Sequence, residues 1–337
     1  MLITKIYKPA EIKQAADELN KGELIAFPTE TVYGLGADAT NELAVKRVYL
    51  AKGRPSDNPL IVTVSSTEMM EQFATDISED ARKLIKNFWP GPLTLVFNIK
   101  PGTLSKAVTG GLKTAAFRMP QNEVTRRLIE LARVPIVGPS ANSSGKPSPT
   151  TAEHVYHDLE GRIAGIVDDG PTQVGVESTI IDMSTDKPLI LRPGAVTVEE
   201  IEAVLQKQLN TDQHKIGADE TPKAPGMKYK HYAPDAQVLI VEEDKWDAAL
   251  TWAKKQPVSV GIMASNMQGQ AIPENCELFD LGSNVEQASH NLFAGLRYFD
   301  DKKDIKWILA AGFAEEGLGI AYMNRLKKSA GDQFFVD

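Results

Sequence analysis

Apolar and polar positions along the first two hundred residues follow a pattern that predicts an α/β domain. Short apolar runs, such as Leu24 to Phe27 and Leu60 to Val64, are typical of buried strands. Between them, apolar residues recur every three or four positions, as in Asn41 to Ala51, which predicts helices. Further helices are expected over residues 9–21, 78–88, 124–132, 151–159 and 197–209, and further strands over 93–99, 114–119, 135–137, 166–167, 179–183 and 189–192.

The pattern stops after residue 209 and resumes near residue 235. The intervening segment is polar, lacks a period and contains several prolines, which is typical of a linker. Beyond it, strands and helices alternate regularly, which predicts a small parallel sheet covered by helices on both faces. The expected organisation is an α/β domain over residues 1–209, a linker over 210–234 and a Rossmann-like α/β domain over 235–337.

Composition and charge indicate a globular protein of ordinary type and disfavour several other classes of protein. With 42% hydrophobic and 24% charged residues the chain is of ordinary globular type, and its 337 residues suit about two domains. We find no run of roughly 20 apolar residues and no signal peptide, so we expect a cytoplasmic protein without a membrane anchor.

Cys276 is the only cysteine, which excludes an internal disulfide and a cysteine-based zinc site. The net charge of −8 argues against a protein that coats nucleic acid, although a local basic pocket remains compatible with it.

The strongest candidate chemistry follows the first long apolar run. A polar stretch with two glycines, Pro28 to Gly36, comes before the helix that ends at Lys52, Gly53 and Arg54. The two cations either decorate a helix C-terminus or, with the rigid polar loop up to Pro59, form an anion site. The glycines imitate a dinucleotide fingerprint, but Pro28 and Thr29 come between the strand and the glycines, and the loop is too polar and too long for the usual tight turn, which disfavours an NAD site. A P-loop motif is absent from the sequence.

Two other features have both a structural and a functional interpretation. Arg118 interrupts an apolar strand, so it needs either a core carboxylate or a ligand carboxylate or phosphate. Arg192 is similar but lies nearer the end of its strand. The polar loop from Ser140 to Gly145 follows a strand directly, where it is either a solvated loop or part of a ligand site at the edge of the sheet.

Several motifs in order give the chain a resemblance to a known family. The motifs are Pro28-Thr29-Glu30-Thr31-Val32-Tyr33-Gly34-Leu35, Lys52-x-Arg54-Pro55, Trp89-Pro90-Gly91-Pro92-Leu93-Thr94, Ala116 to Pro120, Pro139-Ser140-Ala141-Asn142-x-Ser144-Gly145, Leu191 to Gly194 and Gly226 to Pro234. With them the chain resembles the YrdC-like family, in the long two-domain form of the threonylcarbamoyl-AMP synthases. This resemblance implies an open, twisted α/β domain with a large concave cleft, joined to the smaller Rossmann-like domain.

The resemblance also implies a reaction. The family makes L-threonylcarbamoyladenylate and pyrophosphate from L-threonine, bicarbonate and ATP, for threonylcarbamoylation of the adenosine beside the anticodon in tRNAs reading ANN codons. It implies hand-over of the adenylate to a downstream tRNA threonylcarbamoyl-transferase complex, with direct tRNA contact not required. Mg²⁺ is expected with the ATP phosphates, and no protein metal site is expected.

Site residues follow from matching the motifs. The implied catalytic residues are Lys52 and Arg54. The ATP site is implied to contain Arg54, Asn58, Thr114, Ser140, Asn142, Ser148 and Arg192, with Tyr229 and Tyr232 of the linker folding over the nucleotide. The threonine site is implied to contain Thr31, Thr63, Arg118, Gly138 and Ser178, with Thr63 standing where the family often has histidine.

Two other functions are compatible with a YrdC-like sequence. One is a different carbamoyl-adenylating enzyme, as in hydrogenase maturation, but the zinc-finger and acylphosphatase segments of those proteins are missing here. The other is a module that binds double-stranded RNA, which the net charge of −8 disfavours. Only the preferred function requires threonine.

Overall fold

The computed structural model describes residues 2–56, 58–209, 222–223, 232–265, 267 and 271–336. The chain divides into two compact units. The second unit contains residues 230–337 and also two short segments from earlier in the chain, residues 145–148 and 174–176. The expected linker, residues 210–234, lies mostly outside the described residues, and Tyr229 is among those not described. Within the described part of the chain, no helix has the length and apolar character needed to cross a bilayer.

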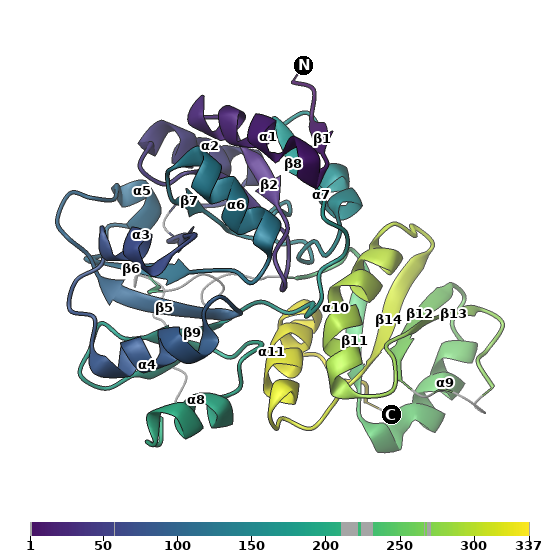
Figure 1. Ribbon diagram of the computed structural model, residues 1–337. Helices are drawn as coiled ribbons and strands as arrows, with labels where there is room; N and C mark the ends of the chain where they lie inside the picture. Colours follow the sequence, from purple (N-terminus) through teal and green to yellow (C-terminus); the bar gives the residue numbers. More distant parts are fainter. Residues whose placement is uncertain are drawn as a thin grey trace. The chain divides into compact units, whose positions relative to one another are not determined.

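A mixed ten-stranded sheet organises the first unit (Figure 1). Its strands lie in the order β1-β8-β2-β3-β7-β4-β6-β5-β9-β10. Their bounds are β1 Lys5–Tyr7, β2 Ile25–Phe27, β3 Gly34–Asp38, β4 Ile61–Thr63, β5 Leu93–Asn98, β6 Thr114–Arg118, β7 Ile136–Val137, β8 Gly165–Val167, β9 Thr179–Asp182 and β10 Leu189–Arg192.

Helices cover both faces of this sheet because successive side chains of a strand point to opposite faces. In β2, Ile25 and Phe27 pack with α1 and α6, whereas Ala26 belongs to the larger core with α2, α4 and α7. The helices of this unit are α1 Ile12–Asn20, α2 Glu42–Lys52, α3 Thr67–Glu71, α4 Glu79–Phe88, α5 Lys106–Thr109, α6 Glu123–Ala132, α7 Ala152–Leu159 and α8 Val198–Leu205.

Helix ends follow the capping residues of the sequence. Ser78 and Thr151 accept hydrogen bonds from main-chain N–H groups and cap α4 and α7, and Thr197 begins α8 with a capping box. Gly53 ends α2 in the left-handed conformation. Helix α8 is shorter than expected, because Gln206 adopts a positive φ and ends it after Leu205.

The expectation of a glycine-bearing polar loop up to Gly36 is wrong at its end. Gly34–Asp38 forms strand β3, antiparallel to β2, so the polar loop covers only residues 28–33. Packing explains why residue 34 is a glycine, because a Cβ there would lie 2.5 Å from Cζ of Phe27. Strand β1 and the short helices α3 and α5 were not expected from the sequence.

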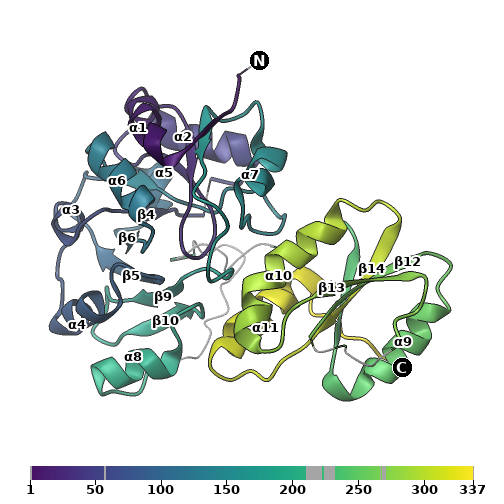
Figure 2. The same ribbon diagram turned by 45° about the vertical axis from the view of Figure 1, so that its right-hand side comes forward.

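The second unit confirms the prediction of a small parallel α/β domain. Its four strands are parallel and lie in the order β11-β14-β12-β13. Helices α10 and α11 cover one face and α9 the other (Figures 1 and 2). The bounds are β11 Gln237–Val241, α9 Trp246–Lys254, β12 Ser259–Ala264, β13 Cys276–Asp280, α10 Val285–Asp300, β14 Ile305–Ala311 and α11 Leu318–Ala330.

Candidate active site

The polar loop between β2 and β3 is tied together by its own threonines. Thr29 Oγ1 donates to the carbonyl of Val32 at 2.6 Å and accepts from the N–H groups of Thr31 and Val32. Thr29 Oγ1 also lies 2.9 Å from Thr31 Oγ1. Side-chain bonds of this kind replace the ladder hydrogen bonds that a turn lacks. The loop therefore holds Thr31 in a fixed, fully buried position.

Arg118, the last residue of β6, faces this loop. Its Nη1 donates to Thr31 Oγ1 at 2.9 Å, and its Nη2 lies 2.8 Å from Oε1 of Glu30. The side chains of Arg118 and Glu30 are only 9% and 2% exposed. Nη2 and Oε1 form an ion pair without an aligned hydrogen bond, and neither atom has a hydrogen-bond partner among the described residues. A buried guanidinium with unused donor capacity suits an anionic ligand such as a carboxylate.

Strand register brings the other expected threonine-site residues to the same end of the sheet. Thr63, the last residue of β4, pairs with Arg118 across the parallel β4–β6 ladder. On the other side of β6, Leu95 of β5 pairs with Phe117, so Thr94 lies beside the end that carries Arg118. Ser178 immediately precedes β9, and its hydroxyl lies 2.8 Å from Thr94 Oγ1.

Gly138 leaves no room for a side chain at this place. A Cβ on Gly138 would lie 2.6 Å from Thr63 Oγ1 and 2.9 Å from Cζ of Phe27. Its N–H donates to the carbonyl of Ile61 at 2.8 Å, which fixes the backbone. The structure therefore brings Thr31, Arg118, Thr63 and Gly138 together as the resemblance implied.

Arg192 binds Ser178 directly. Nη2 of Arg192 donates to the Ser178 carbonyl at 2.9 Å and lies 3.3 Å from its hydroxyl, while Nε reaches the same carbonyl at 3.2 Å. The resemblance assigned Arg192 to the ATP site and Ser178 to the threonine site. The observed contacts place the two side chains in one buried cluster with Thr94.

Lys52 is the centre of a second cluster. It ends α2, is 3% exposed, and its Nζ donates to the carbonyls of Ser140 and Asn142, the latter at 2.6 Å. Ser140 Oγ in turn donates to Asn142 Oδ1 at 2.5 Å. A buried ammonium needs such acceptors. Lys52 thus fixes the loop that follows β7 and contacts Ser140 and Asn142, two residues expected in the ATP site.

Arg54 and Asn58 lie on the loop after α2. Arg54 Nη2 donates to the carbonyls of Asn58 and Pro59, each at 3.3 Å. Asn58 is 1% exposed, and neither its side-chain oxygen nor its side-chain nitrogen has a hydrogen-bond partner among the described residues. Leaving a buried amide unsatisfied costs about 1–3 kcal/mol, so this position is costly unless a ligand supplies the partners.

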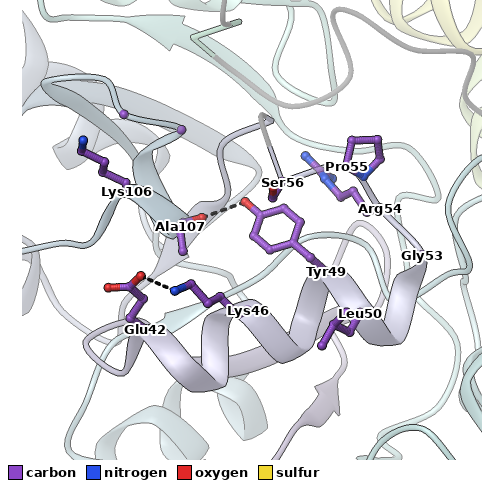
Figure 3. Close-up of a pocket in the computed structure, with 12 residues that line it drawn as sticks. Glu42, Lys46, Tyr49, Leu50, Gly53, Arg54, Pro55, Ser56, Lys106 and Ala107 are labelled. Carbon is purple, nitrogen blue, oxygen red and sulfur yellow. Dashed lines mark hydrogen bonds and ion pairs between the residues drawn. The ribbon is translucent and has the colours of Figure 1, made fainter.

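A pocket of about 850 Å³ lies beside the same loop (Figure 3). Arg54 and Ser56 lie on one side of it and Lys106 on the other, and Tyr49 donates to the Ala107 carbonyl within it. Among the expected site residues, Arg54 alone belongs to its described lining. This pocket is therefore distinct from the two clusters built around Arg118 and Lys52.

The remaining expected residues lie elsewhere. Thr114 is half-buried at the start of β6, at the opposite end of the strand from Arg118. Ser148 and Tyr232 are buried residues of the second unit, and the Tyr232 ring packs on Phe293 with 5.1 Å between centroids. Tyr229 lies outside the described residues.

Sequence reasoning missed two residues of the Arg118 cluster. Glu30 supplies the carboxylate that pairs with the buried guanidinium of Arg118. In the sequence, its position directly before Thr31 was the feature that could have indicated this role. Thr94 links β5 to Ser178, and only its place after a rigid proline–glycine turn pointed to it.

The described ranges contain no group of three or more His, Cys, Asp or Glu residues that could hold an ion. Glu30, the carboxylate in the Arg118 cluster, already pairs with the guanidinium.

Two family models match nearly the whole chain. The model described as "Telomere recombination" matches residues 17–194, and the one described as "Threonylcarbamoyl-AMP synthase, C-terminal domain" matches residues 196–331.

Relatives and solved structures agree with these models. The threonylcarbamoyl-AMP synthases of Pyrococcus abyssi and Bacillus subtilis are 47% and 46% identical, each over 95% of this chain, and over 94% and 93% of their own lengths. A crystal structure of Pyrococcus abyssi Sua5 complexed with L-threonine superposes with a TM-score of 0.90 at 44% identity, covering 99% of both chains. The chain therefore belongs to the threonylcarbamoyl-AMP synthase family.

Proposed function

We propose that this chain forms L-threonylcarbamoyladenylate and pyrophosphate from L-threonine, bicarbonate and ATP. The observation that carries the proposal is the buried cluster of Arg118, Thr31, Glu30 and Thr63. It offers a cation with hydroxyl groups in a confined place, which suits a small hydroxy amino acid. The threonine complex of the Pyrococcus abyssi protein, 44% identical, supports the same substrate.

Arg118 binds the threonine carboxylate in this proposal. Its Nη2 forms an ion pair with Glu30 but no aligned hydrogen bond. An N–H group of the guanidinium is therefore available to donate to the carboxylate of threonine. Thr63 stands next to Arg118 and Ser178 lies across β5, so hydroxyl groups flank the guanidinium on two sides. Gly138 contributes space, because any side chain there would meet Thr63.

ATP binds through the second cluster and the loop beside it. Lys52 holds Ser140 and Asn142, and Arg54 lies on the loop that carries the unsatisfied amide of Asn58. Thr114, Arg192, Ser148, Tyr232 and Tyr229 remain proposed members of the nucleotide site on the strength of the family resemblance. Lys52 and Arg54 are the proposed catalytic residues.

Charge explains what such a site must do. The amine of threonine captures bicarbonate with loss of water, or CO2 with loss of a proton, to give a carbamate. The carbamate oxygen then attacks the α-phosphate of ATP while pyrophosphate leaves. Both reactants are anions, so catalysis consists of neutralising and aligning them, which preformed cations and hydroxyl groups achieve. The reaction needs no nucleophile from the protein. Mg²⁺ bound to the phosphates would neutralise charge on the departing pyrophosphate.

The chemical instability of the product bears on the proposed partners. A mixed anhydride of a carbamate and AMP hydrolyses readily, so it is handed to a tRNA threonylcarbamoyl-transferase complex that modifies the adenosine beside the anticodon. We propose the cytoplasm as the compartment, in keeping with a chain whose single cysteine permits no internal disulfide. Direct tRNA binding is not required by this chemistry.

Pyrophosphate release tests the proposal. Purified enzyme is incubated with ATP and Mg²⁺, and threonine or bicarbonate is omitted in turn. We expect release only when both are present, and we expect serine or glycine in place of threonine to give much less. Release that is independent of threonine would contradict the proposal and favour a different carbamoyl-adenylating activity.

A further inference from the structure

The second unit has a cavity of its own at the carboxyl edge of its parallel sheet. Its volume is about 840 Å³. The described residues that line it come from the ends of β11 and β14, from the segments that follow all four strands, from α11 and from the C-terminal segment, and all of them belong to the second unit. Cavities of about 300–1,000 Å³ have the size that holds a small organic ligand.

The order of the strands explains why a cavity forms at this place. Strands β11 and β14 are parallel neighbours, and their last residues, Val241 and Ala311, are paired. After β11 the chain continues to α9 on one face of the sheet, whereas after β14 it continues to α11 on the other face (Figures 1 and 2). Neighbouring strands whose connections diverge in this way leave a crevice, which is the usual place of a ligand in an open α/β sheet.

Aromatic and sulfur-containing side chains form much of the cavity wall. Trp246 on α9 and Met323 on α11 are both buried, and they come from helices on opposite faces of the sheet. Phe313 lies on the loop after β14, and its ring packs on Tyr322 with 5.0 Å between centroids. The cavity therefore offers a fixed apolar surface to a ligand.

The C-terminal segment completes this wall. It runs beside β11, where the N–H of Ile240 donates to the Gln333 carbonyl at 3.1 Å and the N–H of Phe335 donates to the Ile240 carbonyl at 2.8 Å. Between these two bonds lies Phe334, which lines the cavity and is 36% exposed. An aromatic side chain that is held by its backbone but left exposed is suited to contact with a ligand.

The charge of the lining is negative. Glu242, Glu243 and Glu315 belong to the described lining, whereas no lysine, arginine or histidine does. Lys245 pairs with Glu242 at 3.0 Å and Lys327 pairs with Glu315, but partly exposed pairs of this kind are weak enough for a ligand to compete with them. Glu243 has no ion-pair partner among the described residues. The cavity thus attracts cations and repels anions.

Ser265 adds a polar group with unused capacity. It directly follows β12 and lines the cavity. Its Oγ is buried, and within the described part of the chain it has no hydrogen-bond partner. A buried hydroxyl without a partner is costly, and a ligand in the cavity can supply the missing hydrogen bond.

We propose that this cavity binds a small organic cation with an apolar body, such as an aromatic amine. The carboxylates attract the ammonium group, while the aromatic rings and Met323 contact the body of the ligand. A nucleotide is disfavoured although it often occupies a crevice of this kind, because its phosphates would meet three carboxylates. The site lies within the second unit and does not depend on the proposed function.

The test uses three probes that share an indole ring: tryptamine, a cation; tryptophol, which is neutral; and indole-3-acetate, an anion. Full-length protein with ¹³C-labelled methionine methyl groups is titrated with each probe and followed by NMR. We expect tryptamine to shift the signals of Met267 and Met323, which line the cavity, in a saturable way, and to leave Met70, buried in the first unit, unchanged. Tryptamine should bind roughly tenfold more tightly than indole-3-acetate, with tryptophol between them.

Glu243→Gln tests the contribution of charge. Glu243 is exposed, so the variant should fold as the wild type does. We expect it to weaken tryptamine binding roughly two- to fivefold and to leave tryptophol binding unchanged. Glu274→Gln is the matched control, because Glu274 is an exposed carboxylate just before β13, at the opposite edge of the same sheet. It should bind all three probes like the wild type.

Three results would overturn the proposal. The first is the absence of a shift at Met267 and Met323 with about 10 mM tryptamine, because a cavity that encloses a ligand of this size should bind it more tightly. The second is indole-3-acetate binding that equals or exceeds tryptamine binding. The third is an equal loss of tryptamine and tryptophol binding in Glu243→Gln. The titrations need neither ATP nor threonine, so they are independent of whether the proposed reaction occurs.

Discussion

At the scale of single residues, the buried charges of this protein are explained better by binding than by stability. A buried ion pair such as Arg118 with Glu30 often contributes little or nothing to stability compared with apolar residues of similar volume. The pair also lacks an aligned hydrogen bond. Such a costly arrangement is understandable where a ligand completes it, and three variants test that explanation.

Arg118→Lys tests the threonine cluster. A lysine cannot reach Thr31, Glu30 and the Gly91 carbonyl together, as the guanidinium does. We expect the KM for threonine to rise roughly 10- to 100-fold, which corresponds to a charged hydrogen bond of about 1.5–3 kcal/mol. Arg127→Lys, at an exposed position on α6, is the matched control and should behave as the wild type. Steady-state kinetics with variable threonine give the answer, and an unchanged KM would contradict the assignment.

Asn58→Leu tests whether the unsatisfied amide serves a ligand. Leucine has a similar size and removes two buried polar atoms that lack partners. We expect a melting temperature equal to or above that of the wild type, together with at least a roughly tenfold rise in the KM for ATP. Thermal unfolding and kinetics are measured on the same preparation. A lower melting temperature with normal kinetics would show that Asn58 has a structural role instead.

Lys52→Ala tests the nucleotide cluster. The ammonium binds the carbonyls of Ser140 and Asn142, so its loss removes both a charge and the support of the loop. We expect product formation to fall at least about 100-fold, since one lost transition-state contact is worth roughly 3 kcal/mol. Lys46→Ala is the control, because Lys46 lies on the same helix in an exposed pair with Glu42. Equal activities of the two variants would contradict the role of Lys52.

At the scale of elements, the site is assembled by strand register. Thr63 and Arg118 end two adjacent parallel strands, and Ser178 immediately precedes β9, which lies two strands away from β6. The close approach of β7 to β4 is possible because Gly138 has no side chain. Positions of this kind depend on contacts between strands that are far apart in sequence.

Gly138→Ala tests this close approach. Its Cβ would meet Thr63 Oγ1 at 2.6 Å and Phe27 Cζ at 2.9 Å, so we expect a loss of about 1–3 kcal/mol in the free energy of unfolding. Thr63→Ala removes the first clash, and the double variant should therefore lose less than the sum of the single variants. Denaturant unfolding measures the four proteins. Wild-type stability of Gly138→Ala would contradict the structure at this point.

Features that depend on local sequence could be predicted, whereas features that depend on contacts between distant residues could not. Helices α2, α4 and α7 follow from local periodicity, and each is found within one residue of its expected range. Strand β3 was missed because Gly34 and Gly36 have low strand propensity, and pairing with β2 and β7 overrides it. Glu30 was missed for a related reason, since its role depends on Arg118, 88 residues later.

At the scale of the whole molecule, a chain with a net charge of −8 buries several of its cations. Lys52, Arg118 and Arg192 are each less than 10% exposed. Their charge is thus shielded from bulk water and directed at hydroxyl groups, carbonyls and Glu30 rather than at a nucleic-acid surface. This distribution agrees with an enzyme that joins two small anions and weighs against an RNA-coating protein.

Incorporation of labelled bicarbonate into the product tests the central claim most directly. Enzyme, ATP, Mg²⁺, L-threonine and ¹³C-bicarbonate are combined, and the quenched mixture is examined at once by liquid chromatography and mass spectrometry. We predict an adenylate whose mass contains AMP, threonine and one labelled carbon, formed together with pyrophosphate and greatly reduced with Arg118→Lys. Pyrophosphate release without a product containing both threonine and the label would contradict the account.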